Sequence, residues 1–477
     1  MMQIDYSKRP SACTSILIGR FASTDGSVMI GRNEDSKASW PKHFVVHAAQ
    51  SETKLQTFKS KDNGFTMPLP KASLRYTATP EWTFKYGLFE EDGINEANVA
   101  MSATESAYSN ALVLAADPLV PDGIQEEAMI TVVLPYVTTA REGVARLGQL
   151  VEKYGTAETN GILFADVHEA WYLETGAGHQ WVAQRIPDDG YAVVANQLTI
   201  QQIDFTDSDN FMFAKNIEKF VQEHHLNPDA NGFNFRHIFG TTGVSDETYN
   251  TPRVWVGQKM FNPEIEQSPT DEEMPFIRYA SKRLSVNDAQ QFLSNHFEGT
   301  QYDPVGHESA HRHDFRPISL AKTQESHILQ LRPNVPSAMT GVQWLAMGVA
   351  AQSNYVPFYT AITNTPQAYQ RGQGKYSANS AYWTFKLASV LLDAHYRHFE
   401  AMYTQTQQQL QAQLGAMLQE SDQKASSLAP EEMIQFLTDA NAALAKQALS
   451  TYNALTSDLV TNSTDFSPLN FKTDDNL

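Results

Sequence analysis

The sequence contains a single cysteine, Cys13, among its 477 residues. One cysteine cannot form an intramolecular disulfide, and this scarcity is typical of proteins kept in the reducing cytosol. It also excludes zinc sites that are built from several cysteines. We therefore expect a cytoplasmic protein whose one thiol is either a small buried apolar residue or a reactive group.

The chain also lacks a hydrophobic run of the roughly 20 residues that span a bilayer. Its first residues, MMQIDYSKRPSA, have no apolar segment of the kind found in secretory signals. Basic residues are few: Asp and Glu outnumber Lys and Arg by 54 to 35, which gives a net charge of −19. Such a surface repels phosphate backbones and anionic lipid, so neither nucleic acid nor a membrane is expected as a partner.

With 42% hydrophobic residues, the chain can bury a large core. Residues 11–36 contain two β-rich runs around the turn sequence STDG, which predicts an antiparallel hairpin. Residues 139–155 have apolar positions at helical spacing, between a possible cap at Thr139 and a stop at Gly155, and residues 209–223 repeat the pattern. Helices that cover antiparallel strands indicate an α+β fold. Further strands are predicted within residues 93–105, 161–175, 179–186 and 191–197.

The character of the chain changes at Ser380. Apolar residues at helical spacing predict one long Gln- and Ala-rich helix from there, and Pro430 begins a second helix that continues to about Leu459. These helices are expected to pack on the main domain or on a neighbouring subunit. A homo-oligomer is therefore plausible.

One metal-binding pattern is present, because HESAH at residues 307–311 fits H-E-x-x-H. That motif binds zinc when a helix carries both histidines to one face, with the glutamate as base. Here Pro304, Gly306 and Pro317 restrict any helix to about two turns. A metal peptidase that uses His307, Glu308 and His311 is thus a distant alternative, and no metal or other cofactor is expected.

Cys13 stands where a polar leader meets a strand. Cleavage before it would make it a new N-terminus, whose α-amino group has a reference pKa of about 7.7 to 8.0. Such an amine accepts the thiol proton near neutral pH, so one residue would supply both nucleophile and base. The thiol is then a candidate catalytic group.

Arg32 and Asp35 follow in the second strand of the predicted hairpin. A two-residue turn at Asp25 and Gly26 would place Cys13 opposite Ala38. A five-residue loop instead places Asp35 directly across from Cys13, with Arg32 opposite Ile16 and on the other face of the strand. Both side chains could converge on Cys13 only if the strand bends near Asn33.

These residues lie in a stretch with a known counterpart. CTSILIGRFASTDGSVMIGRNEDS (13–36) resembles the opening of the dipeptidase A family of cysteine peptidases. That family belongs to the N-terminal nucleophile hydrolases and is related to penicillin V and bile-salt acylases. The likeness continues in EDGINEANVAMSATES (91–106), DVHEAWYLETGAGHQWVA (166–183), YAVVANQLTI (191–200), YNTPRVWVG (249–257) and FRPISLAKTQESHILQLRP (315–333).

The resemblance implies a four-layer αββα sandwich with a helical C-terminal extension. Four segments are expected: a leader at residues 1–12, a catalytic domain at 13–379, a helical extension at 380–462 and a polar tail at 463–477. The leader is longer than methionine aminopeptidase removes, so autocatalytic cleavage between Ala12 and Cys13 is expected.

The resemblance also implies roles for individual residues. Cys13 matches the nucleophile, Asp35 the partner of its α-amine, and Arg32 the group that holds the thiolate and the carboxylate. Asn196 matches the side-chain donor of the oxyanion hole, and Arg253 a second arginine that orients the amine. The backbone near Thr104 falls where the family's other oxyanion donor lies.

We therefore predict a cysteine dipeptidase of broad side-chain specificity that acts on small peptides. Such a substrate requires an anion for its free amine, for which Glu105 and Glu174 are candidates. An amidase for N-acyl compounds, such as penicillin V or conjugated bile acids, is the nearest alternative. A non-catalytic binding or assembly protein that uses the C-terminal helices is a third.

Overall fold

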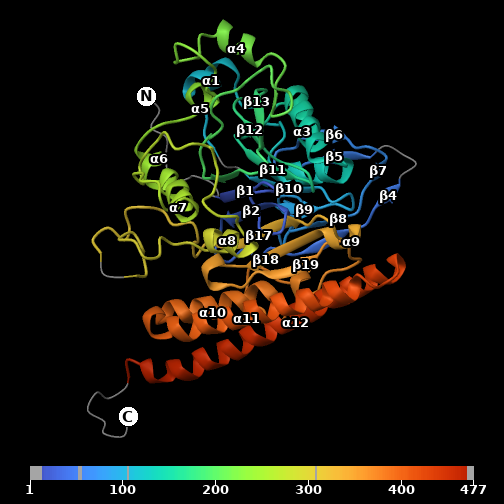
Figure 1. Ribbon diagram of the computed structural model, residues 1–477, viewed down its shortest axis with the longest axis vertical. Helices are drawn as coiled ribbons and strands as arrows, with labels where there is room; N and C mark the ends of the chain where they lie inside the picture. The colour runs from blue at the N-terminus through green and yellow to red at the C-terminus, as the bar shows by residue number, and fades with distance from the viewer. Residues whose placement is uncertain (1–12, 52–55, 105–106, 307–308, 470–477) are drawn as a thin grey trace.

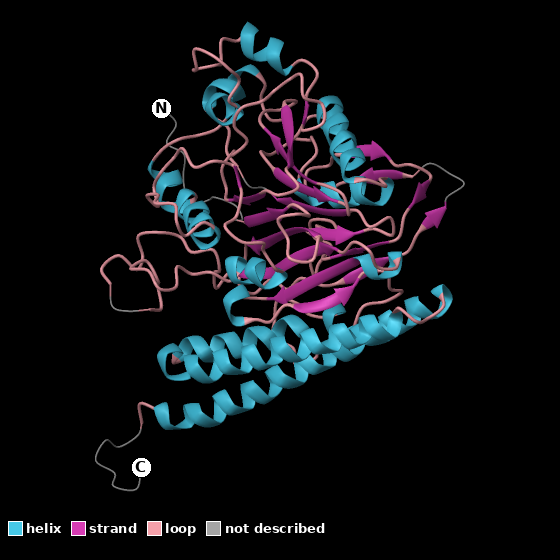
Figure 2. Ribbon diagram, in the orientation of Figure 1, coloured by secondary structure: helices cyan, strands magenta, loops and turns pink. Residues whose placement is uncertain are grey.

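The computed structural model describes residues 13–51, 56–104, 107–306 and 309–469. Two antiparallel sheets form the centre of the molecule, and helices cover their outer faces (Figure 1). Figure 2 shows the sheets as a continuous block of strands, with the helices of the C-terminal part of the chain along one side. This combination of helices and antiparallel strands confirms the predicted α+β class.

The larger sheet has its centre at the predicted hairpin. The first two strands along the chain pair antiparallel there, and a strand from far along the chain adds to the second of them. The hairpin is thus enclosed by segments that are distant in sequence. The order is β16 (Ile277–Arg278), β14 (Tyr191–Val194), β1 (Thr14–Ile18), β2 (Val28–Asp35), β17 (Thr323–Leu331), β18 (Gly341–Met347) and β19 (Val356–Tyr359).

The smaller sheet has six strands, and its inner four come from three of the segments predicted as strands, 93–105, 161–175 and 179–186. Its order is β15 (Phe211–Phe213), β13 (Trp181–Ile186), β12 (Ala170–Thr175), β11 (Gly161–Ala165), β10 (Ala100–Thr104) and β9 (Asp92–Ile94). Three two-stranded ribbons lie beside the sheets. They pair β3 (Val45–His47) with β8 (Tyr76–Ala78), β4 (Gln50–Ser51) with β7 (Ala72–Ser73), and β5 (Thr57–Lys59) with β6 (Thr66–Pro68).

Strand alternation gives the hairpin two buried faces. Leu17 and Ile30 belong to the core that the two sheets share. Ile16 and Met29 point the other way, into a second core beneath the outer helices. Any residue on β1 or β2 therefore faces either the opposite sheet or the helical layer, and both environments exclude water.

Helices on the outer faces follow their sequence signals. α3 (Ala140–Tyr154) begins after Thr139, whose hydroxyl accepts from the Glu142 amide, and ends at Gly155, whose φ of 73° suits glycine. The prediction for residues 209–223 was wrong in its first part, because β15 occupies residues 211–213 and pairs with β13. The other helices are α1 (Ala111–Ala116), α2 (Glu126–Val133), α4 (Ile217–Glu223), α5 (Phe235–Phe239), α6 (Val244–Tyr249), α7 (Thr251–Phe261), α8 (Val286–Leu293) and α9 (Ser337–Thr340).

The C-terminal segment forms three helices, α10 (Ala381–Ala394), α11 (Tyr396–Ala425) and α12 (Pro430–Ser463). The predicted single helix from Ser380 is broken at His395, where φ of −144° and ψ of 50° leave the helical region. α12 begins at Pro430, as predicted. All three helices contribute to a third core beneath β18 and β19.

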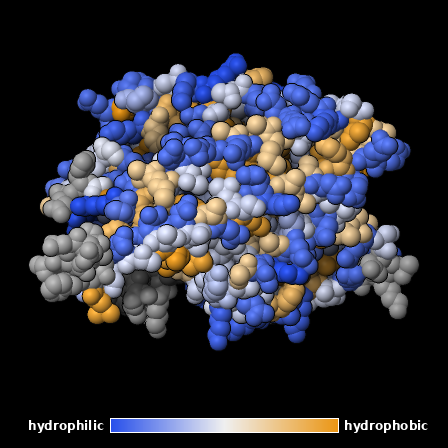
Figure 3. Space-filling model, turned by 90° about the horizontal axis from the view of Figure 1, so that it is seen from below, coloured by the Kyte–Doolittle hydropathy of each residue, from blue (hydrophilic) through white to orange (hydrophobic). Residues whose placement is uncertain are grey.

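The outer face of these helices is mostly hydrophilic, with small apolar patches (Figure 3). Val390, Ile434 and Val460 are the exposed aliphatic side chains of α10 and α12. Within the described ranges, no helix is both long and apolar enough to cross a membrane.

Candidate active site

The register of the hairpin fixes the surroundings of Cys13. Thr14 pairs with Asn33 and Ser15 with Arg32, so Cys13 stands opposite Glu34. The predicted pairing of Cys13 with Asp35 was wrong by one residue. The reason lies in the connection, because residues 19–23 leave the hairpin: Gly19 and Ala22 bond to the chain near Asp188 and Gly190, and Ser23 bridges to Leu284.

This one-residue shift places the functional groups of both strands on one face. Cys13, Arg32 and Glu34 all point between the two sheets. The thiol donates to Glu34 Oε2 at 3.2 Å, and Arg32 Nη1 donates to the sulfur at 3.1 Å. The expected contact between Arg32 and Cys13 therefore forms without a bend in the strand.

The Arg32 guanidinium is fully buried and uses its donors on both sheets. Nε donates to Ser102 Oγ at 2.8 Å, and Nη2 donates to the carboxylate of Glu91 at 2.8 Å. Nη1 also forms an ion pair with Glu34. A buried cation with this many partners has one orientation, so the arginine holds the sulfur between fixed charges.

Asp35 lies on the opposite face of β2, towards the helical layer. Arg316 and Thr323 donate to its two carboxylate oxygens. Arg316 Nη1 also reaches Thr14 Oγ1 at 3.4 Å. Asp35 is therefore connected to the residue after Cys13 through Arg316, rather than across the hairpin.

Arg253 approaches from α7 and joins the other predicted residues. Its Nη1 donates to the Cys13 carbonyl at 2.7 Å and to Thr14 Oγ1 at 2.8 Å. Nη2 donates to Asn196 Oδ1 at 2.7 Å and to Asn250 Oδ1 at 2.8 Å. Because a guanidinium only donates, Asn196 presents its oxygen to Arg253 and its amide nitrogen is directed elsewhere.

Burial has the largest effect on the thiol. It raises the pKa of Cys13 well above the usual value, and the Glu34 carboxylate raises it further. Arg32 and the Thr104 hydroxyl lower the same pKa in part. In this environment the sulfur keeps its proton and donates it to Glu34, so an added base is needed to form the thiolate.

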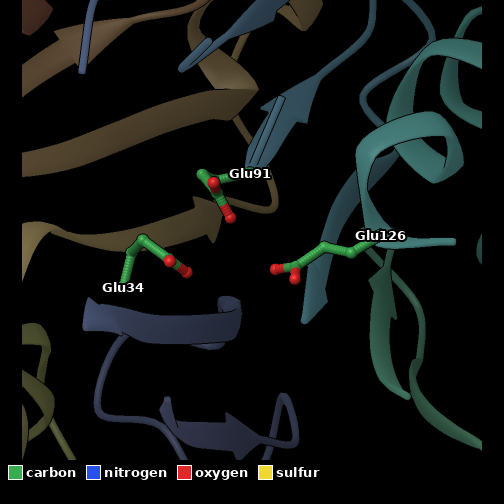
Figure 4. A group of neighbouring side chains, drawn as sticks. All are labelled: Glu34, Glu91 and Glu126. Atoms are coloured by element: carbon green, nitrogen blue, oxygen red, sulfur yellow. The ribbon is translucent and has the colours of Figure 1, made fainter. Parts of the chain in front are cut away.

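Three glutamates meet beside the thiol (Figure 4). Glu34 comes from β2, Glu91 precedes β9 and Glu126 is the first residue of α2; one carboxylate oxygen of each lies within 4.8 Å of the other two. Burial alone would raise the pKa of Glu91, but Lys42 and then Arg32 lower it to about 2. Burial followed by Glu91 raises the pKa of Glu34 to about 8. Glu91 therefore carries the negative charge of the group at neutral pH.

Such a set of carboxylates is the donor type that hard cations prefer. However, the Arg32 guanidinium already lies among these oxygens. It pairs with Glu34 and Glu91, and Nη1 is 3.8 Å from Glu126 Oε1. A divalent ion would have to share this space with a fixed positive charge, which argues against a resident metal.

Of the remaining candidates, Thr104 lies beside the thiol, whereas Glu174 lies in different surroundings. Glu174, in β12, accepts from the backbone amides of Thr199 and Ile200 at 2.7 and 3.1 Å. Thr104 ends β10, and its carbonyl accepts from Asn160 at 3.2 Å. Glu105 lies outside the described residues.

Two of the three residues of the metal-peptidase alternative, His307 and Glu308, also lie outside the described residues. His311 is half exposed in a turn, and its Nδ1 bonds to Asp314 at 2.7 Å.

Sequence reasoning missed Glu34, Glu91, Glu126 and Arg316 as members of the site. Glu34 and Glu91 stand in the GRNEDS and EDGIN segments that were already of interest. The role of Glu34 was hidden because the predicted register of the hairpin was displaced by one residue. Glu91 lies outside the hairpin, and only tertiary packing brings it to Arg32. Glu126 and Arg316 lie far from Cys13 in sequence, and no local pattern connects them to it.

Several known proteins that are similar to this chain carry the name dipeptidase. A profile described as peptidase family C69 matches residues 12–409. A "Probable dipeptidase" of Latilactobacillus sakei is 46% identical over 98% of both chains. A "Probable dipeptidase B" of Lactococcus lactis is 42% identical over 94% of this chain and 95% of its own. "Dipeptidase A" of Lactobacillus helveticus is 40% identical over 91% of this chain and 93% of its own.

Proposed function

The chain belongs to peptidase family C69, and we propose from this that it is a dipeptidase of broad specificity with Cys13 as its nucleophile. The observation that carries the proposal is the position of the only cysteine. Its sulfur lies 3.1 Å from a buried arginine, and its carbonyl accepts from a second buried arginine. A purely structural cysteine needs neither cation.

The finer fold assignment is part of this proposal. Two facing sheets with helices on both outer faces support an N-terminal nucleophile sandwich at residues 13–379, with the helical extension at 380–462 and the tail at 463–477. Removal of residues 1–12 would make Cys13 the N-terminus. The lone cysteine supports a cytoplasmic location, and self-association through the long helices stays a prediction.

The chemistry begins with proton transfer. After cleavage, the α-amine of Cys13 takes the proton of its own thiol, which burial would otherwise keep neutral. The positive charge of Arg32 then stabilises the thiolate. The thiolate attacks the peptide carbonyl, the α-ammonium returns the proton to the leaving amine, and water hydrolyses the thioester.

Asn196 supplies the proposed oxyanion donor. Its oxygen is held by Arg253, which leaves the amide N–H groups to face the developing negative charge. A preorganised donor of this kind typically contributes about 3 to 4 kcal/mol to transition-state stabilisation. Arg253 orients both Asn196 and the Cys13 carbonyl and is therefore a positioning residue. Asp35 is a second positioning residue, because it holds Arg316, which in turn contacts Thr14, the residue after Cys13.

Replacement of the sulfur tests the proposal. Cys13→Ala should abolish the hydrolysis of a panel of dipeptides, because no other thiol exists in the chain. The assay should include penicillin V and a conjugated bile acid as acyl amides. Ser15→Ala, on the same face of β1, is the matched control and should remain active.

Two results would contradict the proposal. Dipeptide hydrolysis that persists in Cys13→Ala would remove the nucleophile. Turnover of the acyl amides without turnover of dipeptides would assign the chain to the acylase type. A form that is expressed without residues 1–12 separates a defect in cleavage from a defect in hydrolysis.

A further inference from the structure

One carboxylate oxygen beside the thiol lacks a hydrogen bond. Glu126 is buried, with 2% of its surface exposed, and among the described residues nothing donates to its Oε1. The nearest cationic atom, Arg32 Nη1, is 3.8 Å away and bonds to other groups. Figure 4 shows this carboxylate directed at those of Glu34 and Glu91. A buried acceptor without a donor is costly, so the arrangement points to a missing partner.

The charges identify the type of partner. Arg32 and Lys42 supply two positive charges to this group, whereas Glu34, Glu91 and Glu126 supply three carboxyl groups. Burial, followed by Glu91 and Glu34, raises the pKa of Glu126 well above its usual value, so a third cation placed beside Glu126 would favour its ionised form. A monovalent cation with hydrogen-bond donors would balance the set. A primary ammonium meets both requirements.

The distances connect this position to the reaction. Glu34 Oε2 lies 3.2 Å from the sulfur, and Glu34 belongs to the same group of carboxyl side chains as Glu126. In a peptide, the α-nitrogen and the carbonyl carbon of one residue are about 2.5 Å apart. An ammonium that hydrogen bonds to these carboxylates therefore brings the carbonyl of the first residue, and no later one, to the thiol.

On the basis of the proposed dipeptidase function, we propose that Glu126, together with Glu34, binds the free α-ammonium of the substrate. The fixed distance to Cys13 then selects the first peptide bond. Small peptides with a free N-terminus are accepted, and N-acylated ones are rejected because they carry no charge for Glu126. This places substrate-amine recognition at Glu126, whereas Glu174 holds the backbone at Thr199 and Ile200.

The test compares a dipeptide with its N-acetyl counterpart. Glu126→Gln keeps the shape of the side chain but cannot ionise when the ammonium binds. A hydrogen bond to a charged group contributes about 1.5 to 3 kcal/mol, so kcat/KM for the free dipeptide should fall roughly 10- to 100-fold, mainly through KM. The much weaker hydrolysis of the acetylated peptide should change little, so the preference for the free amine shrinks.

Glu127→Gln is the matched control. Glu127 is the next residue of α2 and is equally buried, but it does not belong to the three-glutamate group. This variant should keep the preference of the wild type. Thermal unfolding and alkylation of Cys13 by iodoacetamide check that each variant folds. Should Glu126→Gln not fold, Glu126→Asp keeps a carboxyl group on a shorter side chain and should raise KM for the free dipeptide alone.

The outcomes separate this inference from the proposed function. An active wild type, an inactive Cys13→Ala and an unchanged free-amine preference in Glu126→Gln would overturn the role of Glu126 alone. Absence of dipeptide hydrolysis in the wild type would overturn the proposed function. Loss of wild-type activity with a chelator, restored by Mg²⁺ or Ca²⁺, would assign the carboxylates to a metal and contradict the inference.

Discussion

Several ionisable side chains of this protein are buried between the two sheets. Glu174 is a clear case, since its carboxyl group is completely buried and faces two backbone amides. Burial raises the pKa of Glu174 to about 8, although the bonds from Ile200 and Thr199 lower it in part. In an unfolded chain the same group titrates near pH 4.3.

This difference predicts a pH-dependent stability. The folded state retains the Glu174 proton up to about pH 8, so the stabilisation is present at low pH and is lost as pH rises from about 4 to 8. Between pH 6 and pH 9 the group should cost about 3 kcal/mol. In Glu174→Gln, urea denaturation should show a smaller loss of stability over this range than in the wild type.

The exposed Glu218 provides the control, and Glu218→Gln should reproduce the wild-type pH dependence. An equal pH dependence in Glu174→Gln and the wild type would contradict the assigned cause.

The sequence allowed several residues of the candidate site to be predicted, but not all of the side chains that surround them. The structure brings Cys13, Arg32, Asn196 and Arg253 into one hydrogen-bonded group. Their catalytic roles remain predictions. Glu126 could not be found from the sequence, because only tertiary packing carries the start of α2 to the thiol.

Among the secondary-structure elements, the hairpin decides the geometry of the site. Its existence followed from the turn sequence and the β-rich runs, whereas its register did not. The connecting residues pair with Asp188, Gly190 and Leu284 instead of closing a short turn. A turn that takes its partners from elsewhere in the fold does not fix the register locally.

Gly31 tests the packing of the hairpin. It pairs with Ile16 on one side and Ile328 on the other. A β-carbon at this position would lie 2.8 Å from the His327 carbonyl oxygen. We expect Gly31→Ala to destabilise the protein by about 1 to 3 kcal/mol and to lower activity by displacing the adjacent Arg32.

The glycine of α11 offers the matched control. Nothing lies within 4 Å of a β-carbon at Gly415, so Gly415→Ala should be neutral or slightly stabilising. Thermal unfolding and dipeptide hydrolysis of both variants provide the measurement. Equal unfolding temperatures for Gly31→Ala and the wild type would contradict the close packing of β2 against β17 at this position.

Across the whole molecule, the helical extension is part of the folded body. Asn441 of α12 bonds to both the amide and the carbonyl of Tyr359 on β19, at 3.0 and 2.9 Å. It thereby covers an edge strand that would otherwise present unpaired backbone groups. The start of α12 followed from Pro430, but the break at His395 had no signal in the apolar pattern, because that pattern continues on both sides.

The proposed mechanism also depends on cleavage of the chain, because the nucleophilic sulfur and the amine that acts as its base must belong to the same N-terminal residue. Intact-mass spectrometry of the active protein, before and after inactivation by iodoacetamide, tests it most directly. The account predicts a chain that begins at Cys13, takes up one carbamidomethyl group on that residue and then loses dipeptide hydrolysis. Fully active protein that still begins at Met1, or alkylated protein that remains active, would contradict it.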